Sequence, residues 1–407
     1  MKKICAPAGL IAALLLAVPA NAAWHKASSD HFVIYADDDP KDLREFSLRL
    51  ERYDSALNAQ MNLDRPKPSP SNRVNVYVVR NEREVRRLFG DKADRYLGGF
   101  YVPRAGGSFA IIPRLDNQGS EVSESERTLF HEYAHHFMYG SSSVAVPRWL
   151  SEGFAEFYST AKFDKDGSIG LGLPAAHRGL ELAYAINVPL ERLVDTQAYL
   201  AKKSKDYDEF YGKSWALFHY LRFAPERAGQ MDKYLSLIFS GTKEIDAARQ
   251  AFGDLKAMEK DLDKYIHKSR LSYFKVSPSV LKTGDIAVTP LDPGEAAIMP
   301  LLIRSKRGVS DEQAKELVPE VRAVAAQYPA NASVLSELAE AEFDAENDAA
   351  AIAAADRAIS LAPDNVNALL QKAYAMARQA GSSDGSDPKI WSKVRAQFVK
   401  VNKVEND

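Results

Sequence analysis

The segment FHEYAHHF at residues 130–137 carries two histidines, His131 and His135, four positions apart. On an α-helix this spacing sets both imidazole rings on one face, a turn apart, so that they can bind one metal ion. Glu132 lies about 100° further round the helix, beside the coordination position that the rings leave open. The pattern predicts a metal-binding helix with a carboxylate placed to accept a proton from bound water. His136 is expected to point elsewhere and to serve packing or hydrogen bonding.

A second helical segment, PRWLSEGFAEF at residues 147–157, carries two glutamates four positions apart. Packed beside the first helix, it would bring Glu152 to the metal as a third ligand. Glu156 would then lie within hydrogen-bonding reach of a ligand histidine. The alternative is a solvated helix face, but aromatic residues crowd this segment, and buried acids need a partner. We therefore predict one zinc ion per chain, held by His131, His135 and Glu152.

HEYAH followed by WLSEGFAE resembles the gluzincin metallopeptidases, the superfamily that includes thermolysin and the zinc aminopeptidases with their WLNEGFA signature. The resemblance covers roughly residues 95 to 225 and implies the same three zinc ligands. It also implies that Glu132 is the general base and that Glu156 occupies the family's supporting acidic position. Ser151 stands where asparagine is usual, and we expect this change to be harmless.

The segment FYGKSWALFHYL at residues 210–221 is similar to the aminopeptidase segment in which a tyrosine followed by a lysine opens a helix. In that family the tyrosine hydroxyl stabilises the oxyanion of the tetrahedral intermediate, and Tyr211 matches it by position. A phenol donor aimed at the developing charge acts mainly in the transition state. The alternative role for Tyr211 is packing. Tyr207 and His219 are weaker candidates for the oxyanion, and His177 is a candidate for a thermolysin-like proton donor.

The strand expected beside the cleft departs from the aminopeptidase pattern. Zinc aminopeptidases carry a GAMEN strand that holds the free amino group of the substrate, and the corresponding GGSFAII stretch lacks its glutamate and asparagine. The choice between endo- and exopeptidase therefore stays open. An extended peptide could still pair with this strand by strand addition. The predicted substrate-binding residues are Phe109, Ala110, Ile111 and Ile112.

Strand and helix patterns alternate before the metal-binding motif. HFVIYAD at 31–37 and VNVYVV at 74–79 predict strands, and each is followed by a helical pattern. Helical spacing prevails from residue 123 to about residue 273. These patterns predict an α+β fold with a small mixed sheet and a mainly helical lobe, and the family resemblance implies that this is a zincin-like domain. Short β-prone runs such as DIAVTP at 285–290 and AIMPLLI at 297–303 suggest a connector after it.

The last hundred residues are rich in alanine and contain a repeat. PAN at 329–331 is matched by PDN at 363–365, 34 residues later, with small residues at equal offsets after each. This period resembles the tetratricopeptide repeat and implies a concave surface that could bind a protein partner. An ordinary helical hairpin is the alternative. Only about two repeats fit, so neighbouring structure must cap them, and Ile390, Val394, Phe398 and Val401 mark a final helix that could do so.

The first residues are typical of a signal peptide. Lys2 and Lys3 precede an apolar run, and ANA at residues 20–22 supplies the small residues that signal peptidase requires. The alternative is a membrane anchor, but the run contains prolines and is shorter than the ~20 apolar residues that a span needs. We therefore expect a periplasmic or secreted bacterial protein without a membrane anchor after cleavage.

These patterns divide the chain into five parts. They are a signal peptide (1–22), a gluzincin-like catalytic domain (23–273), a connector or short β element (274–308), tetratricopeptide-like helical repeats (309–380), and a flexible segment with a capping helix (381–407).

Composition and charge narrow the functional classes. Hydrophobic residues make up 46% and charged residues 27% of the 407, which excludes a disordered chain and a polytopic membrane protein. With 53 basic and 55 acidic residues, no nucleic-acid partner is expected.

The prediction is a secreted zinc metallopeptidase that acts on peptides or proteins. The alternatives are a catalytically silent periplasmic scaffold that uses the helical repeats, or a zinc hydrolase of non-peptide amides. The intact Glu132 argues against the scaffold, since it is not a metal ligand and an inactive protein could lose it.

Overall fold

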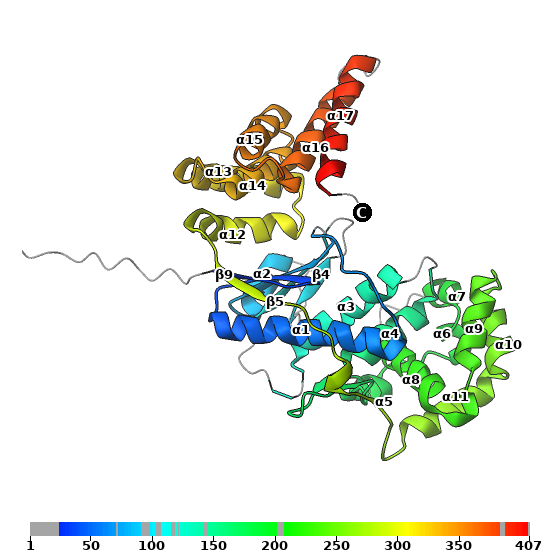
Figure 1. The fold of residues 1–407 in the computed structure, drawn as a ribbon. Helices are drawn as coiled ribbons and strands as arrows, with labels where there is room; N and C mark the ends of the chain where they lie inside the picture. The colour runs from blue at the N-terminus through cyan, green and yellow to red at the C-terminus, as the bar shows by residue number, and fades with distance from the viewer. Residues whose placement is uncertain are drawn as a thin grey trace, which may run out of the picture.

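The computed structural model describes residues 24–70, 72–90, 98–102, 107–114, 119–120, 122–141, 145–201, 207–382 and 387–405. The predicted signal peptide at 1–22 lies outside the described residues. Within them the fold is α+β, with a six-stranded mixed sheet, a small three-stranded sheet and many helices (Figure 1). None of the helices in these ranges combines the length and apolar character that crossing a membrane requires.

The six-stranded sheet has the order β4-β5-β3-β2-β1-β9. Its strands β2, β3 and β5 run parallel, and the other three pair antiparallel with their neighbours. Strand β5 therefore lies inside the sheet, and β4 is the edge strand on this side. The strands are β1 (His25–Ser28), β2 (Phe32–Ala36), β3 (Val74–Val79), β4 (Phe100–Val102), β5 (Phe109–Pro113) and β9 (Ala287–Pro290).

Helices cover both faces of this sheet (Figure 1). Helix α1 (Pro40–Met61) begins at Asp39, whose side chain accepts a hydrogen bond from the Lys41 backbone N–H. Its apolar stripe packs on one face together with α3 (Glu124–Ser141). Helices α2 (Glu82–Phe89) and α12 (Pro293–Lys306) cover the other face. Because successive strand residues point to opposite faces, Ala110 and Ile112 join the first layer, and Phe109 and Ile111 join the second.

The helical lobe is organised around α3, α4 (Arg148–Ser159) and α8 (Phe210–Phe223). Helices α4 and α8 pack closely because Gly153 has no side chain; a Cβ atom there would lie 2.5 Å from the Ser214 carbonyl oxygen. A tight turn joins β6 to the antiparallel β7, and Gly167 in this turn has φ +85°, a conformation that favours glycine. The remaining elements of the lobe are β6 (Lys162–Phe163), β7 (Ile169–Leu171), η1 (Ala176–Arg178), α5 (Gly179–Tyr184), α6 (Leu190–Leu193), α7 (Thr196–Ala201), η2 (Pro225–Arg227), α9 (Gln230–Phe239), α10 (Glu244–Phe252) and α11 (Leu255–Ile266).

The segment 274–308, expected to be a connector or short β element, contributes two short strands to the sheets. Strand β8 (Phe274–Val276) completes the small sheet, and β9 pairs with β1 after a short turn, η3 (Pro278–Val280). The β-prone run at 297–303, read as part of this connector or short β element, forms no strand, because these residues belong to α12. The Asp292 side chain accepts from the backbone of Glu295 while the Glu295 side chain accepts from the Asp292 N–H, so this capping box starts a helix that local β propensity did not reveal.

Five further helices follow α12 and pack on one another in chain order. Buried alanines such as Ala339, Ala355 and Ala373 let their backbones approach closely. In the final helix, Val394 and Val401 are buried, whereas Ile390 is exposed at the helix start. The helices are α13 (Asp311–Gln327), α14 (Ala332–Asp344), α15 (Asp348–Leu361), α16 (Val366–Ser382) and α17 (Pro388–Val404).

Candidate metal centre

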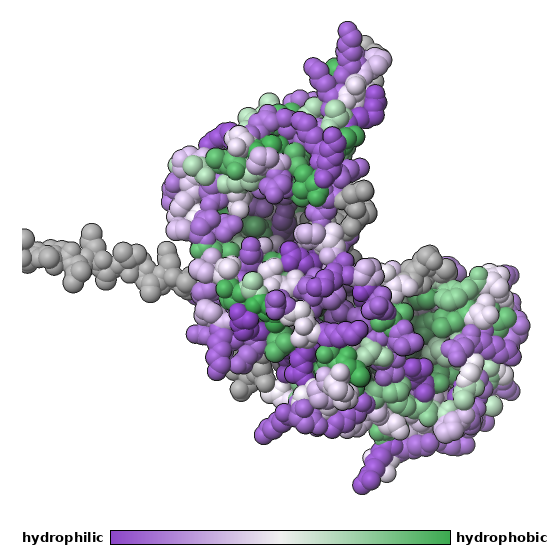
Figure 2. Space-filling model, viewed as in Figure 1, coloured by the Kyte–Doolittle hydropathy of each residue, from purple (hydrophilic) through white to green (hydrophobic). Residues whose placement is uncertain are grey.

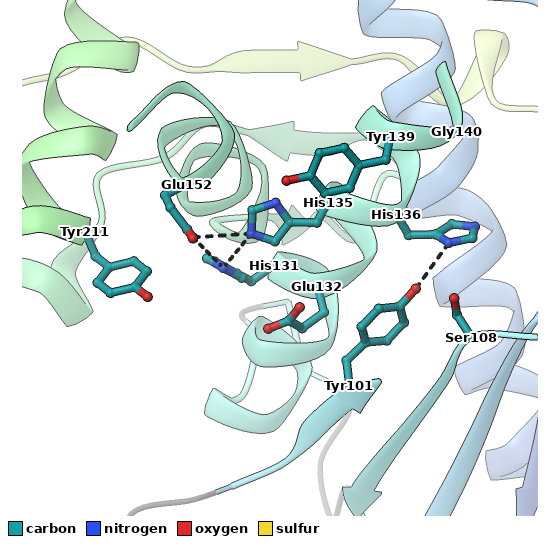
Figure 3. Close-up of a pocket in the computed structure, with 10 residues that line it drawn as sticks. All are labelled: Tyr101, Ser108, His131, Glu132, His135, His136, Tyr139, Gly140, Glu152 and Tyr211. Atoms are coloured by element: carbon teal, nitrogen blue, oxygen red, sulfur yellow. Dashed lines mark hydrogen bonds and ion pairs between the residues drawn. The ribbon is translucent and has the colours of Figure 1, made fainter. Parts of the chain in front are cut away.

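Three side chains from two packed helices converge on one point (Figure 3). The Nε2 atoms of His131 and His135, both on α3, lie 3.2 Å apart. The Oε2 atom of Glu152 on α4 lies 3.4 Å from the first and 3.3 Å from the second. All three donor atoms fall within 4.8 Å of one another, the kind of group that can hold a metal ion. The structure thus brings together the three residues that the spacing selected.

Each imidazole is held from behind through its other nitrogen. Glu156 Oε1 lies 3.2 Å from His131 Nδ1, and Ser151 Oγ lies 3.1 Å from His135 Nδ1. A bond at Nδ1 leaves the Nε2 lone pair free for a metal and fixes the direction of the ring. We expected the serine at 151 to be harmless, but the structure gives it this specific contact. Tyr139, one turn beyond His135, extends the chain of contacts, since its hydroxyl lies 2.8 Å from Ser151 Oγ.

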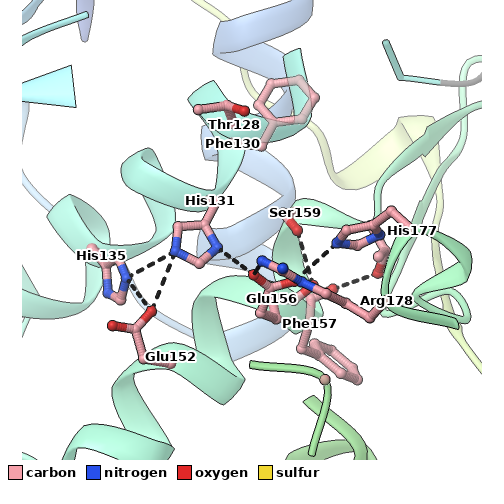
Figure 4. Close-up of polar contacts among 12 residues, drawn as sticks. Thr128, Phe130, His131, His135, Glu152, Glu156, Phe157, Ser159, His177 and Arg178 are labelled. Carbon is pink, nitrogen blue, oxygen red and sulfur yellow. Dashed lines mark hydrogen bonds and ion pairs between the residues drawn. The ribbon is translucent and has the colours of Figure 1, made fainter. Parts of the chain in front are cut away.

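Glu156 is the centre of a buried polar cluster on the far side of His131 (Figure 4). Its Oε2 accepts from His177 Nε2 at 2.9 Å and from Arg178 Nε at 3.0 Å, and a second Arg178 nitrogen contacts Oε1. Burial disfavours the charge of this carboxylate, but these hydrogen bonds outweigh it and hold its pKa well below the ordinary value. His177, a candidate proton donor, is thus engaged behind the site. Arg178 was missed because nothing in its local sequence links it to Glu156.

Burial and hydrogen bonds set the charges of two donors, Glu152 and His131, in opposite directions. Burial opposes ionisation of Glu152, but hydrogen bonds to both histidines prevail and lower its pKa to about 2. Burial likewise opposes a charge on His131, yet its contacts with Glu152 and Glu156 raise its pKa to about 10. A metal ion that binds here must displace the proton that this raised pKa keeps on His131.

The donors open into a pocket of about 580 Å³. Glu132 lines it beside the histidines, and burial raises the pKa of its carboxyl group. Tyr211, in the first turn of α8, lines it from the opposite side with its hydroxyl directed inward (Figure 3). The pocket residues are Tyr101, Ser108, His131, Glu132, His135, His136, Tyr139, Gly140, Glu152 and Tyr211.

The two weaker candidates for the oxyanion donor lie outside this pocket. The Tyr207 hydroxyl donates to Glu181 at 3.0 Å, and its ring is largely exposed. His219 is fully buried between the Tyr265 hydroxyl at 2.8 Å and the Ser272 carbonyl at 3.0 Å. Both side chains have structural partners, so Tyr211 is the candidate that the geometry retains.

The wall opposite Tyr211 contains residues that the sequence did not reveal. The His136 ring points away from the metal donors, as expected, but it still lines the pocket, with Nδ1 3.1 Å from the Tyr101 hydroxyl (Figure 3). Burial lowers the pKa of His136 to about 4, so the ring is neutral at neutral pH. Tyr139 could have been found, because it lies four residues after His135 on the same helix face. Tyr101 belongs to β4 and Ser108 directly precedes β5, and only the tertiary fold brings them here.

The predicted pairing of a substrate with Phe109, Ala110, Ile111 and Ile112 is wrong. These residues form β5, which hydrogen-bonds to β3 on one side and to β4 on the other, and their side chains are buried. Among the described residues, β4 occupies the edge of β5 that β3 leaves, over Phe109–Ile111. Among the described strands, β4 is the outermost on this side of the sheet, and its Tyr101 lines the pocket.

No protein-family model matches this chain, and no curated protein matches it.

Proposed function

We propose that this protein is a zinc metallopeptidase whose catalytic part, residues 23–273, is a zincin-like domain of the gluzincin type. The observation that carries the proposal is the convergence of His131, His135 and Glu152, with Glu132 in the same pocket. The signal-peptide pattern supports action in the bacterial periplasm or outside the cell.

The donor set fits zinc in its chemistry. Two imidazole nitrogens and one carboxylate oxygen, with an open pocket in front of them, are the ligands of catalytic zinc sites. Calcium and magnesium prefer oxygen ligands alone. The Nδ1 contacts with Glu156 and Ser151 leave both Nε2 atoms directed at the shared point. A zinc ion bound there supplies Lewis-acid chemistry, namely polarisation of a carbonyl group and activation of water.

The residues around the donors divide the remaining chemistry. Glu132 accepts a proton from the attacking water and passes it to the amine that leaves. Its raised pKa suits both steps, because a group with a pKa nearer to neutral exchanges protons more readily. Tyr211 donates a hydrogen bond to the oxygen on which negative charge develops. Burial raises the pKa of this phenol, so it keeps its proton at neutral pH.

The substrate lies along the outer edge of β4, which replaces β5 as the proposed substrate-binding strand. An extended peptide pairs with an exposed strand edge through its backbone, and this mode requires no particular sequence. Since Tyr101 of β4 lines the pocket, a peptide on this edge passes the metal donors and Glu132. This supports action on peptide or protein chains over non-peptide amides.

The test is cleavage of a peptide library by the purified zinc-loaded protein and by Glu132→Gln. We expect the substitution to reduce turnover at least 100-fold, which is within the range for general base catalysis, while zinc content stays at one per chain. Full zinc occupancy without cleavage by the wild type would instead favour the scaffold function.

A further inference from the structure

A second cavity, of about 180 Å³, lies where the helical region meets the six-stranded sheet. It shares no lining residue with the metal centre. Helix α12 forms one wall, α14 and the start of α16 form another, and β1 and β2 contribute Lys26 and Tyr35. Figure 2 shows a hollow bordered by hydrophilic side chains between the helical region and the rest of the molecule.

The two walls of the cavity differ in chemistry. The α12 wall is mainly apolar, with Ile298, Met299 and Leu302 facing the cavity. The α14 and α16 wall is polar and offers hydroxyl, amide and carboxylate groups. A cavity of this kind fits a ligand with an aliphatic stem and a polar end.

Most polar groups on the second wall are already paired, either with one another or with Glu295 of α12. Ser336 Oγ donates to Asn365 Oδ1 at 3.1 Å and accepts from Asn367 Nδ2, also at 3.1 Å. Ser333 Oγ donates to Glu295 Oε1 at 2.9 Å. These bonds fix the wall in place before any ligand arrives, which lowers the entropic cost of binding.

Glu337 is the exception. Its side chain is only 11% exposed, and its Oε1 lies 3.9 Å from Lys306 Nζ, which is in closer contact with Glu340. Among the described residues its Oε2 atom has no hydrogen-bond partner. A buried carboxylate oxygen without a partner is costly, and the cost disappears when a cationic donor binds it.

The charges around Glu337 also favour a cation. Glu295, Glu340 and Asp344 add three carboxylates close to it, against Lys26 and Lys306. Burial, reinforced by the Glu340 and Asp344 charges, raises the Glu337 pKa to about 7. The Lys306 charge lowers this pKa but does not outweigh burial, so the carboxylate is incompletely ionised at neutral pH, and a further positive charge favours its ionised form.

We propose that this cavity binds the lysine side chain of a polypeptide partner, with the ammonium group on Glu337 Oε2 and the methylene stem against the α12 wall. The ammonium supplies the donor that Oε2 lacks, and the apolar wall covers the four methylene groups. The site is independent of zinc and of the proposed peptidase activity. It gives the helical region a defined partner chemistry.

The first test uses small probes and needs no variant. We expect n-pentylamine to raise the melting temperature of the full protein in a concentration-dependent way, because a ligand that binds only the folded state stabilises it. The neutral n-pentanol, of equal length, should have no such effect. Equal effects of the two probes, or none from the amine, would overturn the proposal.

The second test locates the site. Glu337→Gln keeps the shape of the side chain and should weaken n-pentylamine binding at least about tenfold, since it removes the charged acceptor. Glu316→Gln is the matched control, because Glu316 is an exposed glutamate on the adjacent helix α13 and should bind as the wild type does. Unchanged affinity in Glu337→Gln would refute the assignment.

A third measurement identifies the source of the ammonium group. A fluorescent peptide with a blocked amino terminus and a single lysine is compared with one that has a free amino terminus and norleucine at that position. We expect the lysine peptide to bind in fluorescence anisotropy and the norleucine peptide not to bind. Binding by the norleucine peptide alone would show that the cavity takes a chain terminus and would contradict the lysine assignment.

Discussion

At the scale of single residues, the two histidines of the centre are held by unlike partners. His131 is backed by the buried, charged Glu156, and His135 by the neutral hydroxyl of Ser151. The Tyr139 hydroxyl bonds Ser151 in turn, and its ring stacks on His135 with centroids 5.9 Å apart. The orientation of the His135 ring therefore depends on Ser151 and Tyr139. Neither residue belongs to the group of metal donors, and both act on it through this ring.

Ser151→Ala should weaken zinc binding by 10- to 100-fold, a typical cost of losing the partner that orients a ligand histidine. Competition with a fluorescent zinc chelator measures the affinity. Ser151→Asn should restore it, because the amide oxygen can accept the same Nδ1–H bond. Ser159→Ala is the control, since this buried serine, within the part of the chain that the structure describes, donates to a backbone carbonyl of its own helix. An affinity unaffected by Ser151→Ala would show that the contact is incidental.

At the scale of elements, the close packing of α4 on α8 sets the distance between Glu152 and Tyr211. A Cβ atom on Gly153 would meet the Ser214 carbonyl oxygen at 2.5 Å and the Phe218 Cβ at 3.1 Å. Both contacts lie on α8, so a side chain at 153 must push the two helices apart.

Gly153→Ala should lower the free energy of unfolding in urea by about 1–3 kcal/mol, the usual cost of overpacking a core. It should also reduce turnover, because Tyr211 moves away from the metal donors. Gly179→Ala is the matched control, because its added methyl group has open space within 4 Å. Equal stability of the two variants would mean that α4 and α8 are not locked together at this point.

A second link between elements joins the start of β2 to α1. His31 Nδ1 lies 2.8 Å from Glu51 Oε2, and its Nε2 lies 3.5 Å from Asp54 Oδ2. Burial lowers the pKa of His31, but the Glu51 hydrogen bond and the two carboxylate charges outweigh it, and the net pKa is raised. Because the pKa of His31 is higher in the folded than in the unfolded state, protonation of His31 stabilises the folded protein. This stabilisation is complete at pH values below the unfolded pKa of 6.5 and is lost as the pH rises through the folded pKa.

His31→Gln should therefore cost more stability at pH 6 than at pH 9. We expect a loss of about 1–3 kcal/mol at pH 6, in line with removal of a hydrogen-bonded buried charge, and a smaller loss at pH 9. Urea unfolding of wild type and variant at both pH values gives the comparison. An equal loss of stability at the two pH values would show that the His31 ring is neutral in the folded protein.

At the scale of the whole molecule, α12 joins the six-stranded sheet to the C-terminal helical region. Its Met299 and Ile303 are buried against the sheet, and its Ile298 is buried among α13 and α14. The helical region therefore packs on the sheet through α12, which belongs to the hydrophobic cores of both. The cavity with Glu337 lies at this junction, so a partner bound there contacts both parts at once.

What the sequence predicted follows from short-range spacing. The pairs at 131/135 and 152/156 each lie one helical turn apart, and the strand patterns at 31–37 and 74–79 alternate in polarity, so local geometry sufficed for them. Sheet order depends on pairing between distant segments, and no local pattern shows that β4 covers β5. For the same reason the sequence did not predict that Tyr101 lines the pocket. It also did not predict α12, because the β-prone residues of this segment oppose the helix that its capping box starts.

The most direct test of the account is the zinc content of the purified protein and of two single-histidine variants, measured by mass spectrometry of the metal. We predict one zinc ion per chain in the wild type and in His136→Ala, and none in His131→Ala. Equal zinc content in the two variants, or a wild type that binds no zinc, would contradict the claim that His131, His135 and Glu152 form a metal centre.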